Sequence, residues 1–230
     1  MPEISIQDKA KRAAGFKAAD LIQDGMTLGL GTGTTISYFI ARLIERCQEG
    51  LKVAAIATSN YSATLALKGN IPLLSNDSIT KIDLAVDGAD EIDPKKRMIK
   101  GGGGALLREK ITGYMADEMM IIVDETKCVE KLGTFPLALE IAPFGYAATL
   151  EHLKNAGYTP TLRKGTTFAF FLTDNGNYIV DLHFKDLIDC PEELDQKLHA
   201  IPGILETGLF LNLAKKVIVG YPDGMTTILK

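Results

Sequence analysis

The sequence has few of the residues that bind metals or form disulfides. Three cysteines and three histidines occur in 230 residues, no two cysteines form a CxxC pair, and no histidines have HExxH spacing. We therefore expect buried, reduced thiols and no metal held by histidine. No stretch comes near the roughly 20 apolar residues of a membrane helix, and the first residues lack the apolar core of a signal peptide. These absences predict a cytoplasmic protein with no membrane partner.

The chain also lacks an excess of positive charge. It carries 25 Lys and Arg against 29 Asp and Glu, a formal net charge of −4, and no basic stripe. Nucleic-acid binding depends on neutralising phosphates with Lys and Arg, so we expect no nucleic-acid partner. A small anion remains compatible with this composition, because one local site can be positive on an acidic protein.

Short apolar runs alternate with helical patterns in the first part of the chain. Strands are predicted at 26–30, 51–57, 82–86 and 119–123, and helices at 36–48, 61–68 and 105–115. Strands that are apolar throughout indicate an α/β fold, with a mostly parallel sheet covered by helices on both faces. In the helix 105–115, we expect Leu106, Leu107 and Ile111 to face the core.

The pattern changes from Gly133 onward, where helices mix with antiparallel strands. This mixture predicts a separate, smaller α+β domain. A short apolar run at 216–219 should return to the parallel sheet. We therefore expect a discontinuous first domain, residues 1–132 and 206–230, and an inserted α+β lobe, residues 133–205.

A turn rich in glycine and threonine, GLGTGTT, follows the first predicted strand and leads into a helix. Such a turn directs free backbone N–H groups toward an anion. The dinucleotide fingerprint GxGxxG fails because Thr34 stands where glycine is needed, and a Walker A motif fails because no lysine follows the glycines. The hydroxyls of Thr32, Thr34 and Thr35 suit one small phosphate monoester or another compact polar group. A purely structural turn is the alternative.

The segment DGADEIDPKKRMIKGGGGALLREK concentrates the residues that could perform chemistry. It places Asp87 and Asp90 after an apolar run, Lys100 before four consecutive glycines, and Glu109 in the first turns of a helix. Each glycine loses more chain entropy on folding than alanine, about 0.4–1 kcal/mol, so the loop indicates close approach of the backbone to a ligand. Ligands of parallel sheets bind at the carboxyl ends of the strands, where both glycine-containing segments begin. We expect them to share one cleft.

Read together, GTGTT, DGADEID, KGGGGALLREK, IPGILETGLF and VIVGYPDG resemble ribose-5-phosphate isomerase of the A type. The resemblance covers nearly the whole chain in order, and KGGGGALLREK after DGADE is its most specific part. Thr34 departs from the usual family turn GTGST but keeps a hydroxyl, and Lys215-Lys216 stands where an acidic residue is common.

The resemblance implies interconversion of D-ribose 5-phosphate and D-ribulose 5-phosphate in the non-oxidative branch of the pentose phosphate pathway. It further implies a Rossmann-like domain with an inserted lobe, no required metal or cofactor, and a homodimer or homotetramer. We expect the lobe to serve oligomerisation.

The family's functional residues match positions of this chain. The family's catalytic base corresponds to Glu109, and its acidic pair corresponds to Asp87 and Asp90. Its lysine beside the glycines corresponds to Lys100, and its second lysine corresponds to Lys127. The remaining substrate-binding positions are Thr32, Gly33, Thr34, Thr35, Gly88, Ala89, Gly101, Gly102 and Gly103. We expect Glu109 to move a proton between adjacent carbons through an enediolate, Lys100 and the loop amides to stabilise its oxygen, Asp87 to open the sugar ring, and Asp90 to position hydroxyls.

Three other functions use related scaffolds. The first is a sugar-phosphate sensor, which would ordinarily carry a DNA-binding segment that the short N-terminus has no room for. The other two are an amino-sugar phosphate deaminase and a CoA transferase, the latter with a carboxylate nucleophile. Conversion of ribose 5-phosphate to ribulose 5-phosphate separates the isomerase from all three.

Overall fold

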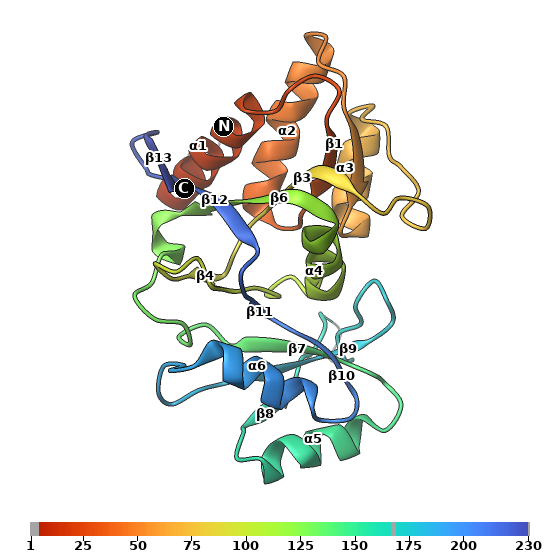
Figure 1. Ribbon diagram of the computed structural model, residues 1–230, viewed down its shortest axis with the longest axis vertical. Coiled ribbons are helices and arrows are strands. Elements are labelled where there is room, and N and C mark those ends of the chain that lie inside the picture. The colour runs from red at the N-terminus through yellow and green to blue at the C-terminus, as the bar shows by residue number, and fades with distance from the viewer. Residues whose placement is uncertain (1–4, 167–168, 230) are drawn as a thin grey trace. The chain divides into compact units, whose positions relative to one another are not determined.

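The computed structural model describes residues 5–166 and 169–229, which form two compact units (Figure 1). The first contains residues up to Ala89, Arg108–Cys128, and residues from Leu213 onward; the second contains Asp90–Leu107 and Val129–Asn212. Residues 1–4 and 230 of the predicted first domain, and 167–168 of the predicted lobe, lie outside the described residues. The segment 90–107, which the sequence prediction places in the first domain, groups with the second unit.

A six-stranded, mostly parallel sheet forms the centre of the first unit. Its strands, in sheet order, are β13 (Thr226–Leu229), β12 (Ala214–Gly220), β6 (Ala116–Asp124), β3 (Ile82–Asp87), β1 (Thr27–Leu30) and β2 (Ala54–Ala57). Only β13 is antiparallel to its neighbour. The predicted return of the last apolar run to this sheet is confirmed, because β12 pairs in parallel with β6.

Helices cover both faces of this sheet, as the apolar strands predict. They are α1 (Ile6–Asp20), α2 (Thr34–Gln48), α3 (Asn60–Lys68) and α4 (Leu106–Met115). Leu28 and Leu30 of β1 belong to one core cluster with residues of α1 and α2. Gly29, between them, points to the opposite face, where a Cβ atom would lie 2.4 Å from Thr112 of α4. Successive residues of β1 thus face opposite sides of the sheet, with α1 and α2 on one side and α4 on the other.

The second unit is an α+β structure with antiparallel strands. A four-stranded sheet has the order β10 (Ile204–Thr207), β7 (Leu137–Ile141), β9 (Tyr178–Leu182) and β8 (Pro160–Leu162). A three-stranded sheet has the order β11 (Leu209–Phe210), β5 (Met98–Ile99) and β4 (Glu91–Ile92), and the helices are α5 (Tyr146–Asn155) and α6 (Pro191–His199). Gly208 connects β10 to β11 and bonds through its N–H to Ala138 and through its carbonyl to Lys100 N–H.

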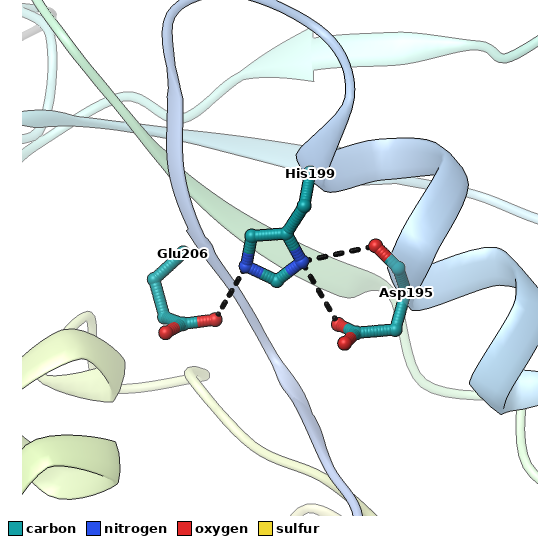
Figure 2. Close-up of side chains that lie close together, drawn as sticks. All are labelled: Asp195, His199 and Glu206. Atoms are coloured by element: carbon teal, nitrogen blue, oxygen red, sulfur yellow. Dashed lines mark hydrogen bonds and ion pairs between the residues drawn. The ribbon is translucent and has the colours of Figure 1, made fainter.

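His199 links α6 to β10 (Figure 2). Its Nδ1 lies 2.9 Å from the carbonyl oxygen of Asp195, and its Nε2 lies 3.0 Å from Oε1 of Glu206. Thr207 adds a hydroxyl bond to Asp195 and a backbone N–H bond of 2.8 Å to Glu206. Because these polar groups bond to one another across the helix and the strand, we assign the cluster a structural role. Of the helices in the described residues, none has the length and apolar character needed to cross a membrane.

Candidate active site

The candidate site of the first unit lies where its strand order reverses direction. From β1 the chain passes through α2 to β2 on one side, whereas β3 pairs with the other side of β1. Carboxyl ends of strands at such a reversal are the usual ligand sites of open α/β sheets. The turn after β1 and Asp87 at the end of β3 therefore occupy neighbouring positions at this edge.

The turn after β1 is fixed by hydrogen bonds from three segments. The N–H of Gly31 donates to Val86 of β3 at 2.9 Å, and the Gly31 carbonyl accepts from the Ser62 hydroxyl at 2.5 Å. The hydroxyls of Thr32 and Thr58 lie 2.8 Å apart. Thr58 and Ser62 are not among the predicted site residues, although the hydroxyl pair Thr58-Ser59 directly after the apolar run of β2 was a readable signal for Thr58.

The same turn exposes the N-terminus of α2. Gly33 is its N-cap, with φ of 118°, and carries no side chain that could cap the first N–H groups. Thr34 is exposed and Thr35 is partly buried, and the first turn holds no acidic residue. A helix end of this kind attracts an anion through its N–H groups and its dipole.

Asp87 is buried at the end of β3 and is held by backbone N–H groups. It is 2% exposed, and its Oδ1 accepts from Gly88 at 2.8 Å and from Thr32 at 3.3 Å. A Cβ atom at Gly31 would lie 2.1 Å from the same oxygen, so only glycine lets the turn after β1 pass this close. The carboxylate is thereby fixed beside the turn. Gly88 and Ala89, the next predicted binding residues, are partly buried.

Helix α4 buries Leu106, as predicted, but it also buries three polar side chains and exposes two large apolar ones. Glu109, Lys110 and Thr112 are 5%, 8% and 6% exposed, whereas Ile111 and Tyr114 are 52% and 73% exposed. The prediction that Ile111 faces the core is wrong, because the face of α4 that packs on Gly29 carries Thr112. Burying a carboxylate and an ammonium costs free energy that an ordinary core helix avoids. The orientation of α4 therefore indicates a functional face.

The topology also sets the level of Glu109 along the sheet. A right-handed crossover from β3 to the parallel strand β6 sends α4 back from the carboxyl ends of the strands. Glu109 precedes Thr112 by three residues, a rise of about 4.5 Å. Thr112 lies against Gly29, so Glu109 belongs near the level of Gly31, the glycine beside Asp87.

Lys127 follows the end of β6 in a short 3₁₀ turn, Glu125–Lys127. The turn is capped by buried Asp124, whose Oδ1 accepts from Thr126 N–H at 3.1 Å. Lys127 is partly buried, which places a cation on the same edge of the sheet as the ends of β1 and β3.

The remaining predicted site residues belong to the second unit. Lys100 directly follows β5, is only 3% exposed, and lies with Nζ 5.3 Å from the centre of the Phe210 ring. Its backbone N–H donates to Gly208 at 2.8 Å. A nearly buried lysine that packs on an aromatic ring has a restricted position for its charge.

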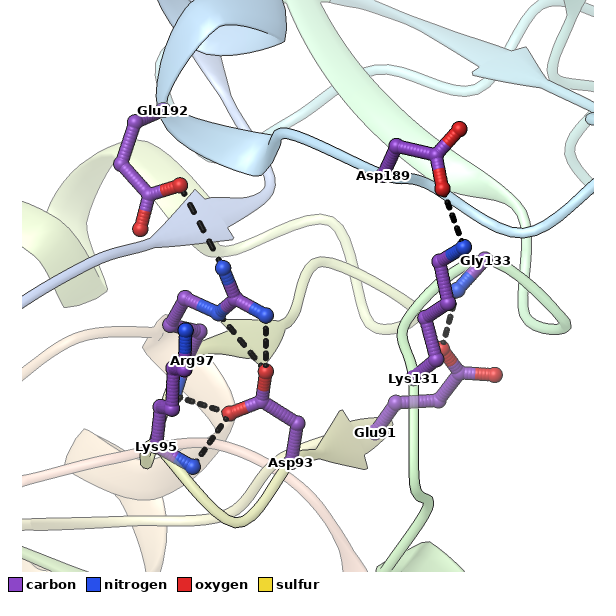
Figure 3. A network of polar contacts seen from close by, with 8 residues as sticks. All are labelled: Glu91, Asp93, Lys95, Arg97, Lys131, Gly133, Asp189 and Glu192. Carbon is purple, nitrogen blue, oxygen red and sulfur yellow. Dashed lines mark hydrogen bonds and ion pairs between the residues drawn. The ribbon is translucent and has the colours of Figure 1, made fainter.

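The hairpin that leads to Lys100 is anchored by buried carboxylates (Figure 3). Asp93 accepts from the backbone N–H groups of Lys95 and Arg97 at 2.9 Å each and from Nε of Arg97 at 2.7 Å. Glu91 accepts from the N–H groups of Gly133 and Phe135 at 2.7 and 2.6 Å. These bonds fix β4 and β5, and with them the start of the glycine loop.

The glycine loop presents its second and third residues to solvent. Gly102 and Gly103 are exposed, Gly101 has φ of 104°, and Gly104 N–H donates to Gly101 at 3.0 Å. Asp90 accepts from the N–H of Gly102 at 2.8 Å, so this acid is paired with the loop. The predicted site residues thus form two groups: Asp90, Lys100 and Gly101–Gly103 in the second unit, and the others in the first.

Comparisons with known proteins agree on one family. The model of the family described as ribose 5-phosphate isomerase A (phosphoriboisomerase A) matches residues 54–224. Ribose-5-phosphate isomerase A of Protochlamydia amoebophila is 52% identical over 220 residues, which cover 96% of this chain and 95% of that protein. Ribose-5-phosphate isomerase A 1 of Oceanobacillus iheyensis is 45% identical over 95% of this chain and 97% of its own.

Solved structures give the same result. A D-ribose-5-phosphate isomerase in complex with phospho-erythronic acid superposes with a TM-score of 0.92 at 38% identity, covering 97% of this chain and 99% of that one. Ribose 5-phosphate isomerase A of Methanocaldococcus jannaschii gives a TM-score of 0.89 at 39% identity, covering 96% and 98%.

Proposed function

Because this chain belongs to the ribose 5-phosphate isomerase A family, we propose how its residues divide the work of interconverting D-ribose 5-phosphate and D-ribulose 5-phosphate. Membership in this family decides against the sensor, deaminase and CoA transferase alternatives. The observation that carries the assignment of roles is the buried carboxylate of Glu109 on a helix that leaves Ile111 and Tyr114 exposed.

Glu109 is the proposed base. It takes the proton from C2 of the open-chain aldose, and the electrons of that bond form the C1=C2 double bond while O1 becomes negatively charged. The proton on O2 then passes to O1, and the carboxylic acid of Glu109 returns its proton to C1, which leaves the ketone at C2. One carboxylate acts at both carbons, because the two are adjacent and the proton stays on one face of the molecule.

Lys100 and the amides of Gly101–Gly103 are proposed to stabilise the oxygen that becomes negative. A cation and N–H groups with fixed positions lower the energy of such an oxygen without reorganising during the reaction. The 3% exposure of Lys100 and its packing on Phe210 support a fixed charge. The solved relative that binds phospho-erythronic acid holds a phosphorylated sugar acid, and a carboxylate resembles the paired oxygens of an enediolate.

Asp87 is proposed to open the sugar ring, with Asp90 positioning substrate hydroxyls. Ring opening moves a proton between the anomeric hydroxyl and the ring oxygen, which a carboxylate can relay. The exposed N-terminus of α2, with Thr32, Gly33, Thr34 and Thr35, suits the phosphate, and Lys127 adds positive charge at the same edge. The backbone of Gly88 and Ala89, which follow Asp87, is proposed to contact the substrate as well.

The reaction itself is the first test. The purified chain is expected to convert ribose 5-phosphate to ribulose 5-phosphate, with the ketose followed by its absorbance, at the same rate with and without excess chelator. The reason is that an ammonium and backbone amides, rather than a metal, stabilise the enediolate. Loss of activity in chelator that a divalent cation restores would contradict this assignment. Absence of any ketose would contradict the function.

We assign the chain to the cytoplasm as a homodimer or homotetramer, with the 133–205 lobe as the oligomerisation region. The three cysteines, Cys47, Cys128 and Cys190, are free thiols, which is compatible with a reducing compartment. The prediction that they are buried is wrong for Cys128 and Cys190, which are exposed. The lobe carries exposed apolar side chains: Phe144 at 96%, Leu172 at 61%, Leu187 at 43% and Phe170 at 41%. Contacts between subunits would remove this apolar surface from water.

Light scattering after gel filtration measures the number of subunits. A particle mass of two or four times 24.9 kDa is expected, and Phe144→Ser should shift the mass toward the single chain. As a matched control, Met225→Ser changes another exposed apolar residue, 65% exposed but outside the lobe, and should leave the mass unchanged. A monomeric wild-type chain would argue against oligomerisation. A change of mass in Met225→Ser but not in Phe144→Ser would argue against the lobe as the oligomerisation region.

A further inference from the structure

We propose that Arg163, held by Asp181, is a positioning residue that sets the direction of the amides in the glycine loop. The inference rests on the proposed role of Gly101–Gly103 at the developing negative charge. Arg163 donates hydrogen bonds to two carbonyl groups of the loop. All of the residues involved belong to the second unit.

The guanidinium of Arg163 has partners on two sides. Asp181 of β9 accepts from Nε at 2.9 Å and from Nη2 at 2.5 Å, the paired geometry that suits a carboxylate. Nη1 donates to the carbonyls of Gly101 at 2.9 Å and Gly102 at 3.1 Å. Both charged side chains are mostly buried, with 16% and 17% exposure. Asp181 neutralises the arginine, so orientation of the loop, rather than added charge, is the main effect.

Holding these carbonyls determines where the next N–H groups point. In a trans peptide the C=O and the following N–H point in opposite directions, and the described chain has no cis peptide bond. The N–H groups of Gly102 and Gly103 therefore face away from Arg163. The first of them donates to Asp90 at 2.8 Å, as this geometry requires, and both residues are exposed. Arg163 thus aims two consecutive amides in one direction.

Glycine needs such a support because its backbone is permissive. Gly101 has φ of 104° and lacks a Cβ that would restrict it, so the loop has many accessible conformations in isolation. Arg163 is itself fixed: its N–H donates to Ile179 at 2.8 Å, its carbonyl accepts from Phe171 at 2.9 Å, and its guanidinium lies 5.7 Å from the Phe171 ring. The same ring packs on Gly104, where a Cβ would lie 2.4 Å from it.

The experiment compares Arg163→Ala with Arg46→Ala. Arg46 is a matched control in the other unit, because it also donates to two backbone carbonyls, those of Ala19 and Ile22. Arg46 lies at the C-terminal end of α2, remote from Gly33. Arg163→Ala is expected to lower kcat about 10- to 100-fold with KM within about threefold of wild type, since misaimed amides fail chiefly in the transition state. Millimolar guanidinium should restore part of kcat. Arg46→Ala should lower the melting temperature and leave kcat at the wild-type value. Millimolar guanidinium should not change the kcat of this variant.

Arg163→Lys keeps the proposal testable should the alanine variant not fold. A lysine keeps the charge but cannot hold Asp181 and two carbonyls at once, so kcat should still fall with an unchanged circular dichroism spectrum. A folded Arg163 variant with wild-type kcat, or a loss that Arg46→Ala reproduces, overturns the positioning role. In that case, a lowered kcat in Lys100→Met would leave the proposed loop chemistry standing, and an unchanged kcat there would remove the loop from the reaction as well.

Discussion

Glu109→Gln is expected to lower kcat at least about a hundredfold, the scale of general-base catalysis, while KM for ribose 5-phosphate stays close to wild type. The amide keeps the size and most hydrogen-bonding capacity of the side chain but cannot take a proton from carbon. Because Glu109 is 5% exposed, an isosteric replacement is the variant least disturbing to α4. Steady-state kinetics with matched circular dichroism measures both effects.

Glu118→Gln provides the control for this variant. Glu118 lies on β6 in the same unit and is exposed, so the loss of its charge should leave kcat unchanged. Equal kcat values for Glu109→Gln and wild type would remove Glu109 as the base. A large rise of KM with unchanged kcat would instead assign it to substrate binding.

Lys100→Met is expected to lower kcat by about a hundredfold or more, with a smaller change in KM. Removing one oxyanion donor typically costs about 2.7–4 kcal/mol of transition-state stabilisation, since the charge develops only during the reaction. Methionine keeps the apolar stem that packs near Phe210 and removes the ammonium. The measured quantity is the separate change in kcat and KM.

Lys131→Met is the control for the lysine variant. Lys131 belongs to the same unit and pairs with Asp189, whose side chain is 85% exposed, so this ion pair contributes little. Its replacement should leave both kinetic constants unchanged. If Lys100→Met alters KM alone, the lysine binds the substrate without stabilising the enediolate.

Much of the fold could be predicted because the central strands are buried on both faces. The consecutive residues Ile121, Ile122 and Val123 are all nearly inaccessible to solvent, so such runs read as continuous apolar segments rather than alternating ones. Glycine and proline mark the ends of the elements between them. The order of the strands in the sheet depends on packing between distant segments, so no single segment predicts it. The parallel direction of the strands was predictable, because it follows from their continuous apolar runs.

The orientation of α4 shows where apolar periodicity fails. Ile111 fits a core position by spacing, yet it is 52% exposed because Thr112 packs where Gly29 leaves room. A glycine on a strand more than eighty positions away thus determines which face of the helix is inward. The adjacent acid and lysine, Glu109 and Lys110, indicate a chemical role in the sequence, but they do not indicate which face of the helix is buried.

The support of the glycine loop could not be predicted for a related reason. Arg163 and Gly101 are 62 residues apart, and Arg163 and Asp181 are 18 apart, with no motif that relates them. Only the pairing of β8 with β9 brings the two charges together. The predicted site residues of the glycine loop are contiguous in sequence, whereas the side chains that hold them come from segments elsewhere.

Deuterium incorporation tests the proton transfer by Glu109 most directly. Proton NMR of ribose 5-phosphate with enzyme in D₂O follows the signals of the carbon-bound hydrogens at C1 and C2, and Glu118→Gln serves as the reference variant. The assignment of Glu109 as the base predicts that wild type and Glu118→Gln move or exchange these hydrogens, whereas Glu109→Gln leaves the C2 hydrogen in place over the same period. Removal of the C2 hydrogen by Glu109→Gln at the wild-type rate would contradict it.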